Sequence, residues 1–368
     1  MYNTLKRFFA SIEMSKRTIK ERERNQRKSR WAIIKLQRKN VLKKKRSWNN
    51  YARLKGIDNI RNDTEDHKPQ YEVVAPEVFS LVNNLEETLS FFSKVFSFSK
   101  KCNKGDILFF NLSGVNVITP DAVMYLISII RNMKRFQGLG IYCKGNVPRN
   151  ESARIYLAKT GFYNYVRAIG ALNDKHDENI VQILSGKNAD SVTAAKTCDF
   201  VKAKVKPCFI QTRLLYRSII EMMTNTFQHA YRGFDISNDM SSNWYLYVEN
   251  QQDSICFVFL DTGAGIPATI RKNYKEKLKS IVKNDDATYI ASALKGEFRT
   301  STGQTYRGKG LPALYEDVLS IDNSGLMILS GSGRCIVQND GTIDETNSKL
   351  SLKGTLFSWQ LNKKMEEK

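Results

Sequence analysis

An apolar run that ends in an aspartate and two glycines constrains the fold of this chain more than any other stretch. The run Ile255–Leu260 has the length and the aromatic and β-branched content of a buried strand, and it continues directly into Asp261. Gly263 and Gly265 follow, and glycine permits a tight turn and a close approach of the backbone to a flat ring. An ionised carboxylate at a strand end accepts hydrogen bonds, for example from the exocyclic amine of adenine. We therefore expect Asp261, the two glycines and the adjacent Ile266 to line a ligand site.

A helix predicted upstream of this strand brings polar side chains together beside an apolar face. Residues 209–231 contain neither Gly nor Pro, and their apolar positions recur at helical spacing. At about 100° per residue, Glu221, Asn225 and His229 share a neighbouring face of this helix. A Glu accepts a proton and the carboxamide oxygen of Asn is a neutral hard ligand, so the pair fits a positioned water and a divalent metal. Alone, this spacing is a weak signal, because such pairs also occur on exposed helices.

A glycine-rich segment near residue 310 has the features of an anion-binding helix start. A polar stretch over residues 299–307 leads into Gly308-Lys309-Gly310-Leu311-Pro312. Proline suits the first turn of a helix, so we expect the backbone N–H groups of Gly308 to Leu311 to point towards an anion. Lys309 adds a positive charge for terminal phosphates. Further on, Gly354–Trp359 has the composition of a strand that closes the sheet.

These four segments, in this order, resemble the GHKL family of ATPases and kinases, and the resemblance covers residues 207–363. The family's N box is matched by Glu221, Asn225, His229 and Ala230. Its three glycine boxes are matched by Asp261 with Gly263 and Gly265, by Gly308 with Gly310, and by Gly354 with Thr355. One box alone would be a coincidence, whereas four in register are specific. The resemblance implies a Bergerat-type α+β sandwich with a mixed sheet that binds ATP and Mg2+.

The resemblance also implies a role for the matched residues. Asn225 would hold Mg2+ against the phosphates, Asp261 would accept a hydrogen bond from the adenine amine, and Thr355 would support that contact. Glu221 would be the general base, and the loop before the second glycine box would form a lid. One position departs from the family, because the second box often continues with glycine where this chain has Pro312. That departure bears on the flexibility of the lid hinge and leaves phosphate binding in place.

Residues 71–170 have the alternating pattern of a small α/β domain. Strands are expected at Ile107–Leu112 and Gly140–Cys143, and the helices that follow are expected to open at Thr119-Pro120-Asp121 and to span Glu151–Lys159. This order resembles STAS-like domains, in which a Ser or Thr at the start of the helix can accept phosphate. By that resemblance Thr119 is the candidate, with capping of the helix as the alternative role. Residues 171–206 are rich in Asn, Asp, Lys, Ser and Ala and are expected to be a linker with some helix.

The positive charge of the chain is concentrated at its amino terminus. The formal net charge is +21, and residues 1–55 hold 19 Lys or Arg against 3 Glu, whereas the rest holds 39 Lys or Arg against 34 Asp or Glu. These 55 residues lack Gly and Pro, so a basic helical arm is expected over residues 1–61. Its run Lys43–Arg46, flanked by Trp31 and Trp48, fits phosphates and a stacked base. Nucleic acid and an acidic protein stay open as partners, with docking on the chain's own body or an anionic membrane surface as further alternatives.

Composition disfavours several other classes. The longest largely apolar run, Val123–Ile130, is far shorter than the roughly 20 residues that cross a bilayer, and no apolar segment of a secretory signal follows the basic amino terminus. Six Cys without a Cys-x-x-Cys pair and three scattered His give little support to disulfides or a zinc site. We therefore expect a cytoplasmic protein of two or three domains, and we leave open whether it forms a homodimer.

Two function classes follow from these expectations. In the first, ATP binding and slow hydrolysis move the lid and thereby the basic arm, which makes the protein an ATP-gated switch. In the second, the ATP domain and the STAS-like domain form a Ser/Thr protein kinase of the anti-sigma-factor type. The arm favours the first class, because a kinase domain alone does not need it. A histidine kinase is disfavoured because His176, its candidate phosphoacceptor, lacks a paired helical hairpin, and purely structural nucleotide binding is disfavoured by Glu221.

Overall fold

The computed structural model describes residues 71–102, 106–136, 142–169, 171, 177–205, 212–228, 243–274, 284–298, 310–320 and 325–363. Residues 69–368 form one compact unit. The basic arm predicted over residues 1–61 lies outside the described residues, so its helical character stays a prediction.

A four-stranded parallel sheet forms the first part of this unit. Its strand order is β1-β3-β5-β6, with β1 at Tyr71–Val74, β3 at Ile107–Asn111, β5 at Tyr142–Asn146 and β6 at Arg167–Ile169. A separate parallel pair is formed by β2 (Val78–Phe79) and β4 (Val117–Ile118). Between the strands run α2 (Leu85–Lys101), α3 (Pro120–Phe136), α4 (Glu151–Lys159) and the 3-10 turn η1 (Phe162–Asn164). Parallel strands need such crossover connections, which accounts for the alternating pattern in the sequence.

A larger antiparallel sheet forms the second part. Its order is β10-β11-β9-β8-β7, with β7 at Ile180–Gly186, β8 at Trp244–Asn250, β9 at Ser254–Asp261, β10 at Leu326–Val337 and β11 at Ile343–Asn362. The helices of this part are α5 (Ser191–Lys204), α6 (Thr212–Gln228), α7 (Ile266–Asn273), α9 (Asp286–Leu294) and α10 (Gly310–Ser320).

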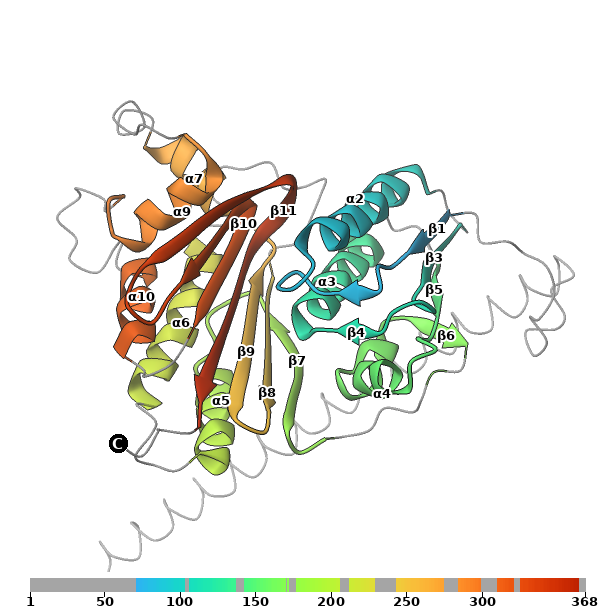
Figure 1. Cartoon of the computed structure of the whole chain (residues 1–368), viewed down its shortest axis with the longest axis horizontal. Helices are drawn as coiled ribbons and strands as arrows, with labels where there is room; N and C mark the ends of the chain where they lie inside the picture. Colours follow the sequence, from blue (N-terminus) through green and yellow to red (C-terminus); the bar gives the residue numbers. More distant parts are fainter. Residues whose placement is uncertain are drawn as a thin grey trace, which may run out of the picture. The chain divides into compact units, whose positions relative to one another are not determined.

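The larger sheet is covered on both faces, and alternate residues of each strand serve two different cores. On β9, Phe257 and Phe259 pack with α5, α6, α9 and α10, whereas Val258 and Leu260 pack with α2 and α3. Figure 1 shows the resulting order of layers: small sheet, α2 and α3, large sheet, and then α5, α6, α7, α9 and α10. A strand buried on both faces has a continuous apolar sequence, and this explains the run Ile255–Leu260.

The first part of helix α3, residues 120–130, is apolar except for Asp121 and Ser128 and lies between the two sheets. Residues 120–130 are all buried, and α3 contacts α2 as well as β8 and β9 of the large sheet. A helix that is covered on every side needs no polar face, and the apolar run Val123–Ile130 reflects this position. Within the described part of the chain, no helix has both the length and the apolarity required to cross a membrane.

The coarse expectation of a mixed α and β protein with parallel and antiparallel sheets is confirmed. The strands expected at 107–112 and 255–260 and the helix expected at 151–159 agree with β3, β9 and α4 to within one residue at each end. The strand expected at 140–143 instead spans Tyr142–Asn146. Its polar end was missed because Lys144 and Asn146 are held in the sheet by backbone pairing and, at Asn146, by side-chain hydrogen bonds to Asn111 and Leu112, and not by the burial of apolar side chains.

Residues 171–206 were expected to be a linker with some helix; the helix is present, but the segment also adds a strand to the large sheet. It contains β7, which pairs with β8, and α5, which buries Ala194, Cys198 and Val201 against the large sheet. The polar residues of β7 are compatible with a strand at the edge of the sheet. Small buried residues on α5 give a weak periodic signal, which is why the helix was not recognised as part of the core.

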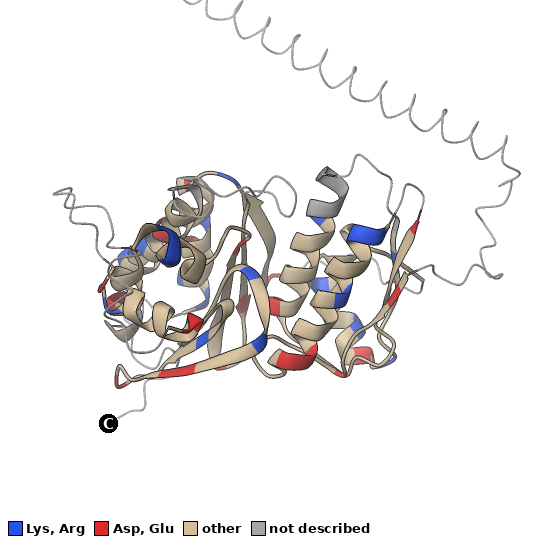
Figure 2. Cartoon of the chain, turned by 90° about the horizontal axis from the view of Figure 1, so that it is seen from above, with Lys and Arg blue, Asp and Glu red and all other residues tan. Residues whose placement is uncertain are grey.

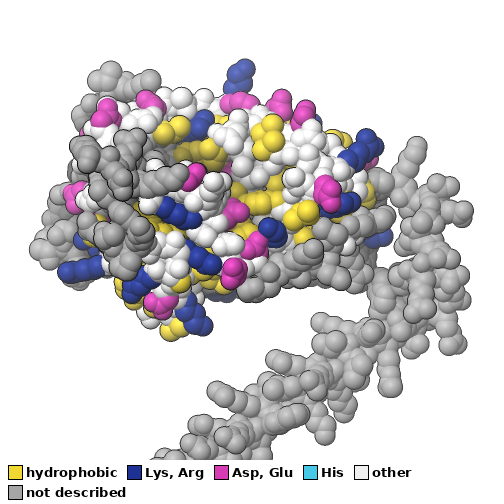
Figure 3. Space-filling model, turned by 60° about the horizontal axis from the view of Figure 1, so that its bottom comes forward, with side chains coloured by type: hydrophobic (Ala, Val, Ile, Leu, Met, Phe, Trp, Pro, Cys, Tyr) yellow, Lys and Arg dark blue, Asp and Glu magenta, His cyan; other side chains and the backbone are white. Residues whose placement is uncertain are grey.

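Charged residues of both signs are interspersed along the described elements (Figure 2). Helix α2 shows a favourable arrangement, because Glu86 and Glu87 lie in its first turn and Lys100 and Lys101 in its last, which complements the helix dipole. On the face drawn in Figure 3, apolar side chains lie among charged ones. The large apolar side chains that stay exposed among the described residues come from different elements: Val74, Val117, Val192 and Tyr216.

Candidate functional site

Three polar side chains lie in a row across neighbouring strands at one end of the large sheet. Thr355 of β11 is opposite Asp261 of β9, and Ser330 of β10 is opposite Thr355. All three are buried. They lie on the face covered by α6 and α10, because Phe259 and Phe357, two residues along the same strands, belong to that core. This row ends an otherwise apolar face with three hydrogen-bonding groups.

Asp261 is a buried carboxylate whose ionisation is opposed by its surroundings. Burial raises the pKa of Asp261 to about 6, although hydrogen bonds from the backbone N–H of Gly263 and from the Thr355 hydroxyl lower it in part. The Gly263 nitrogen lies 2.9 Å from Oδ1 of Asp261. A buried carboxylate of this kind gains most from a further hydrogen-bond donor, so the site is suited to a ligand that supplies one.

Ser330 holds the neighbouring backbone segments together. Its Oγ donates to the carbonyl oxygen of Gly354 at 3.0 Å and accepts from the backbone N–H of Ile266 at 2.9 Å. The Oγ1 of Thr355 lies 3.1 Å from the same Oγ. A single hydroxyl therefore links β10, β11 and the start of α7 directly beside Asp261.

Two glycines with positive φ allow this close packing. Gly265, just before α7, has a φ of 85°, and Gly354, just before Thr355, has a φ of 98°. A Cβ on Gly354 would lie 2.1 Å from the carbonyl oxygen of Asp261, and a Cβ on Gly265 would lie 2.8 Å from Oγ of Ser330. The backbone conformation and the space both require glycine at these two positions.

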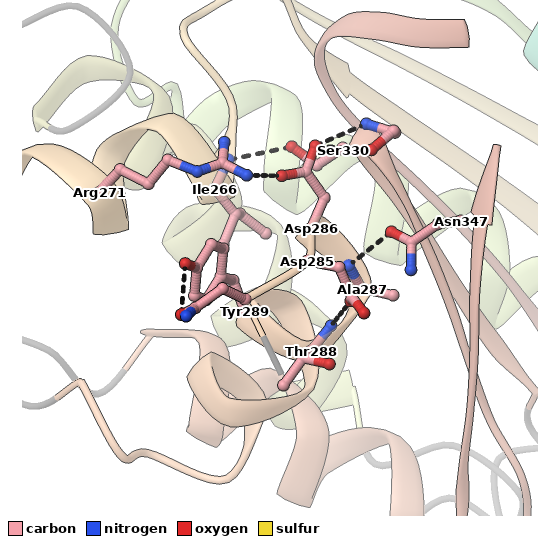
Figure 4. A network of polar contacts seen from close by, with 11 residues as sticks. Ile266, Arg271, Asp285, Asp286, Ala287, Thr288, Tyr289, Ser330 and Asn347 are labelled. Carbon is pink, nitrogen blue, oxygen red and sulfur yellow. Dashed lines mark hydrogen bonds and ion pairs between the residues drawn. The ribbon is translucent and has the colours of Figure 1, made fainter. Parts of the chain in front are cut away.

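Helix α7, which follows the turn after Asp261, is anchored by a polar network shown in Figure 4. Arg271 of α7 forms an ion pair with Asp286, the first residue of α9, and its guanidinium lies over the ring of Tyr289 at 5.0 Å from the centroid. The other carboxylate oxygen of Asp286 accepts hydrogen bonds from the backbone N–H and the hydroxyl of Ser332 on β10, at 2.8 and 2.9 Å. These contacts fix the position of α7 and therefore of the glycine-containing turn before it.

Glu221 and Asn225 of α6 meet the first residue of α10. A Cβ on Gly310 would lie 2.6 Å from Nδ2 of Asn225 and 3.0 Å from Oε2 of Glu221, so only glycine fits here without moving both side chains. The first turn of a helix has backbone N–H groups without intrahelical partners and carries partial positive charge. Burial raises the pKa of Glu221, while Arg217 lowers it and Asp317 raises it further. A carboxyl group, a carboxamide and a helix N-terminus are thus brought together.

The residues on α6 and those on the sheet lie at the same end of the sheet. Trp244 is opposite Asp261, and its indole Nε1 donates to the carbonyl oxygen of Asn188 at 2.8 Å. Two residues further on, the backbone N–H of Asp190 donates to Sδ of Met223 on α6, at 3.5 Å. The segment after β7 therefore connects the neighbour of Asp261 to the part of α6 that carries Asn225.

The predicted site residues fall into four groups. The structure brings Glu221, Asn225 and Gly310 together, and it brings Asp261, Gly263, Gly265 and Thr355 together. Ile266 and Leu311 are half-buried and pack against apolar clusters, and the Ile266 N–H is already bound to Ser330. His229, Gly308, Lys309 and the polar stretch 299–307 lie outside the described residues.

Thr119, the candidate phosphoacceptor, directly precedes α3. Its side chain is half-buried, its hydroxyl lies 3.5 Å from the carbonyl oxygen of Phe79, and an interaction with the same hydroxyl lowers the pKa of Asp121. These contacts tie Thr119 to β2 and to the first turn of its own helix.

Sequence reasoning missed Ser330 and Asp317. For Ser330 a signal exists, because the apolar strand Leu326–Leu329 breaks into Ser-Gly-Ser-Gly at this residue. Asp317 follows Glu316 on α10, and the sequence does not indicate which of these two acidic side chains is buried. In the structure Glu316 is exposed whereas Asp317 is buried.

The chain was compared with known proteins. No protein-family model matches it, and no curated protein matches its sequence.

Proposed function

We propose that this chain binds ATP with Mg2+ and hydrolyses it in a site of the GHKL type, so that residues 207–363 act as a Bergerat-type ATP-binding domain. The observation that carries the proposal is the approach of Gly310 to both Glu221 and Asn225, on the sheet face that also holds Asp261 and Thr355. In the sequence these residues match the motifs of one family. In the structure they lie close together, and this proximity supports a common ligand.

The strand-end row would bind the adenine. Asp261 is buried and already accepts hydrogen bonds from Gly263 and Thr355, and an exocyclic amine is a further neutral donor that favours its ionised form. The apolar side chains of the same core would cover the ring faces.

The junction of α6 and α10 would bind the phosphates. The N-terminus of α10 supplies backbone N–H groups, and the absence of a Cβ on Gly310 lets a phosphate oxygen approach them. The carboxamide oxygen of Asn225 would hold Mg2+, which when bound neutralises phosphate charge.

Glu221 would act as the general base. It would take a proton from a water whose oxygen bonds to the γ-phosphorus, while the bond from that phosphorus to the bridging oxygen breaks and releases ADP and phosphate. Its half-buried position beside the α10 N-terminus is compatible with holding a water there.

The experiment is incubation of the protein with γ-labelled ATP and Mg2+, together with calorimetric measurement of ATP binding. Wild type should release labelled phosphate slowly. Glu221→Gln should bind ATP but not release phosphate, and Asn225→Ala should lose the Mg2+ dependence of binding. Asp261→Ala should lose about 2 kcal/mol of binding free energy, or roughly 30-fold in affinity. A folded wild-type protein that binds no ATP would overturn the proposal.

The same assay distinguishes the second candidate function. Label that appears on this protein or on a protein of an added lysate, and not as free phosphate, would support a Ser/Thr protein kinase of the anti-sigma-factor type. Our preference for an ATP-gated switch comes from the charge of residues 1–55, which calls for an anionic partner. The likeness of residues 71–170 to STAS-like domains is part of the proposal and is compatible with their parallel sheet and crossover helices.

A further inference from the structure

Strand β11 contains an irregularity immediately before Thr355. The ladder with β10 passes from Ser330 opposite Thr355 to Gly331 opposite Leu352, so Lys353 and Gly354 are two extra residues on β11. Extra residues of this kind take backbone groups out of the ladder and redirect the strand. Their hydrogen bonds must come from elsewhere, because Gly354 and its neighbours Leu352 and Thr355 are buried and Lys353 is half-buried.

Two hydroxyl groups hold this bulge from opposite faces of the sheet. On the face of α6 and α10, Ser330 donates to the carbonyl oxygen of Gly354 at 3.0 Å. On the face of α2 and α3, the hydroxyl oxygen of Tyr125 accepts the backbone N–H of Lys353 at 2.9 Å. The bulge that precedes Thr355 is thus fixed in part by a residue of the layer between the two sheets.

Tyr125 is held rigidly in that layer. It is completely buried on α3, and its ring packs edge-on against Phe92 with the centroids 4.7 Å apart. The ammonium group of Lys353 lies over the ring of Phe96, 4.9 Å from the centroid, so the side chain and the backbone of Lys353 both contact this layer. A rigid acceptor defines where the N–H of Lys353 can lie.

We propose that Tyr125 is a positioning residue for adenine recognition: by holding Lys353 it sets the bulge that places Thr355 opposite Asp261. This inference rests on the proposed function and adds that α3, on the far face of the sheet, contributes to nucleotide selectivity. Because binding coupling is reciprocal, nucleotide binding must in turn stabilise the contact between Tyr125 and Lys353.

The test is the preference for ATP over inosine triphosphate, which has a carbonyl where ATP has the exocyclic amine. Wild type should bind ATP roughly 30-fold more tightly, as expected for a hydrogen bond to a charged acceptor. Tyr125→Phe removes the acceptor and keeps the ring, so the preference should fall to about 3-fold while the affinity for inosine triphosphate changes less than about 2-fold. A merely structural role would weaken both nucleotides equally.

A matched control is Tyr156→Phe. Tyr156 on α4 also contacts the large sheet, through Glu249 at 3.2 Å and Tyr247 at 3.3 Å, but these lie along β8 away from the end that pairs with Asp261. Its removal should leave the ATP preference unchanged. If wild type prefers ATP and Tyr125→Phe keeps the full preference, or if both variants lose it alike, the positioning role is wrong while the proposed function stands. If wild type binds neither nucleotide, the proposed function itself fails.

If circular dichroism shows that Tyr125→Phe does not fold, hydrogen exchange of the wild-type protein tests the positioning role instead. Saturating ATP should slow exchange of the Lys353 amide at least several-fold, because it stabilises the bulge from which that amide would open. Unchanged exchange at Lys353 with ATP bound would overturn the proposal.

Discussion

Asp317 of α10 accepts hydrogen bonds from Arg217 and Ser218 of α6 and ties the two helices together across their shared face. The Arg217 Nε and the Ser218 hydroxyl lie 3.0 and 3.1 Å from Oδ2 of Asp317, and a second guanidinium nitrogen completes an ion pair. One and two turns further along α6, Glu221 and Asn225 meet Gly310, which lies two turns before Asp317 on α10. The helices therefore run antiparallel, and the ion pair sets the position of the α10 N-terminus.

Arg217→Met should destabilise the protein and weaken nucleotide binding. The carboxylate of Asp317 is buried and would lose its cation, whereas Arg217 is itself half-exposed, so we expect a loss of about 1–3 kcal/mol in the free energy of unfolding. Urea denaturation measures this loss. ATP titration measures the loss of affinity that we expect from the accompanying displacement of α10. The double variant Arg217→Met/Asp317→Asn should recover part of the stability, since it no longer buries an unpaired charge.

The control for this pair is the exposed ion pair between Lys202 and Asp199 on α5, where the two charged atoms are 3.8 Å apart. Lys202→Met should change the free energy of unfolding by less than about 0.5 kcal/mol. Equal effects at Arg217 and Lys202 would contradict a specific role for the α6 and α10 ion pair.

Gly310→Ala should change the stability of the fold little and should lower the ATP turnover strongly. The added Cβ would meet the ends of Asn225 and Glu221, which are flexible and move aside at little cost to the fold. Their displacement should nevertheless lower ATP turnover by roughly 100-fold, because small misplacements of reacting groups are costly. Gly325→Ala, where a Cβ has nothing within 4 Å, should leave turnover unchanged. Phosphate release and thermal unfolding of both variants check the prediction, and full activity of Gly310→Ala would contradict it.

Local sequence patterns predicted the strands and helices that carry the candidate site residues, but not how these elements meet. The run before Asp261 could be recognised because a doubly covered strand is apolar throughout, and Pro312 marked the start of α10 because proline suits a first helical turn. The approach of Gly310 to Asn225 depends on the crossing of two helices that are far apart in sequence, and helical spacing carries no information about that crossing. The role of Tyr125 was hidden for the same reason, since its apolar neighbours made it indistinguishable from an ordinary core residue.

Deletion of residues 1–55 should remove salt-dependent binding to nucleic acid, if the basic arm binds it. Each neutralised phosphate releases counterions, so the logarithm of affinity should fall linearly with that of salt, with a slope of about −0.9 per contact on duplex DNA. The deletion should flatten the slope and preserve ATP hydrolysis. Titration of both proteins on one labelled duplex checks this, and equal slopes would point to a protein partner for the arm.

Asp261→Asn should stabilise the nucleotide-free protein at neutral pH. Burial raises the pKa of Asp261 from 3.8 to about 6. The favourable contribution of this carboxyl group to the free energy of unfolding is therefore complete below its unfolded-state pKa and is lost as the pH rises through 6. The ionised group at pH 7.5 therefore costs about 3 kcal/mol, of which a neutral amide of the same shape should recover 1–3 kcal/mol. Urea denaturation at pH 7.5 should show the gain and at pH 4.5 should show little. A variant that is less stable than wild type at pH 7.5 would contradict the conclusion that ionised Asp261 destabilises the nucleotide-free protein.

The preference for ATP over inosine triphosphate should fall as the pH is lowered through about 6. The ionised form of Asp261 accepts a hydrogen bond from the amine more strongly than the protonated form, and its pKa of about 6 means that the protonated form dominates below that pH. The bound amine favours the ionised form, so ATP binding releases a proton in this range and its affinity should drop by up to about tenfold per pH unit. The triphosphates of the two nucleotides titrate alike, and Glu221 faces the phosphate end in both complexes, so the ratio of the two affinities isolates Asp261. Calorimetric titrations at pH 5, 6, 7 and 8, in buffers of different ionisation enthalpy, measure both the ratio and the proton release. A ratio that does not change over this range would show that Asp261 does not contact the amine.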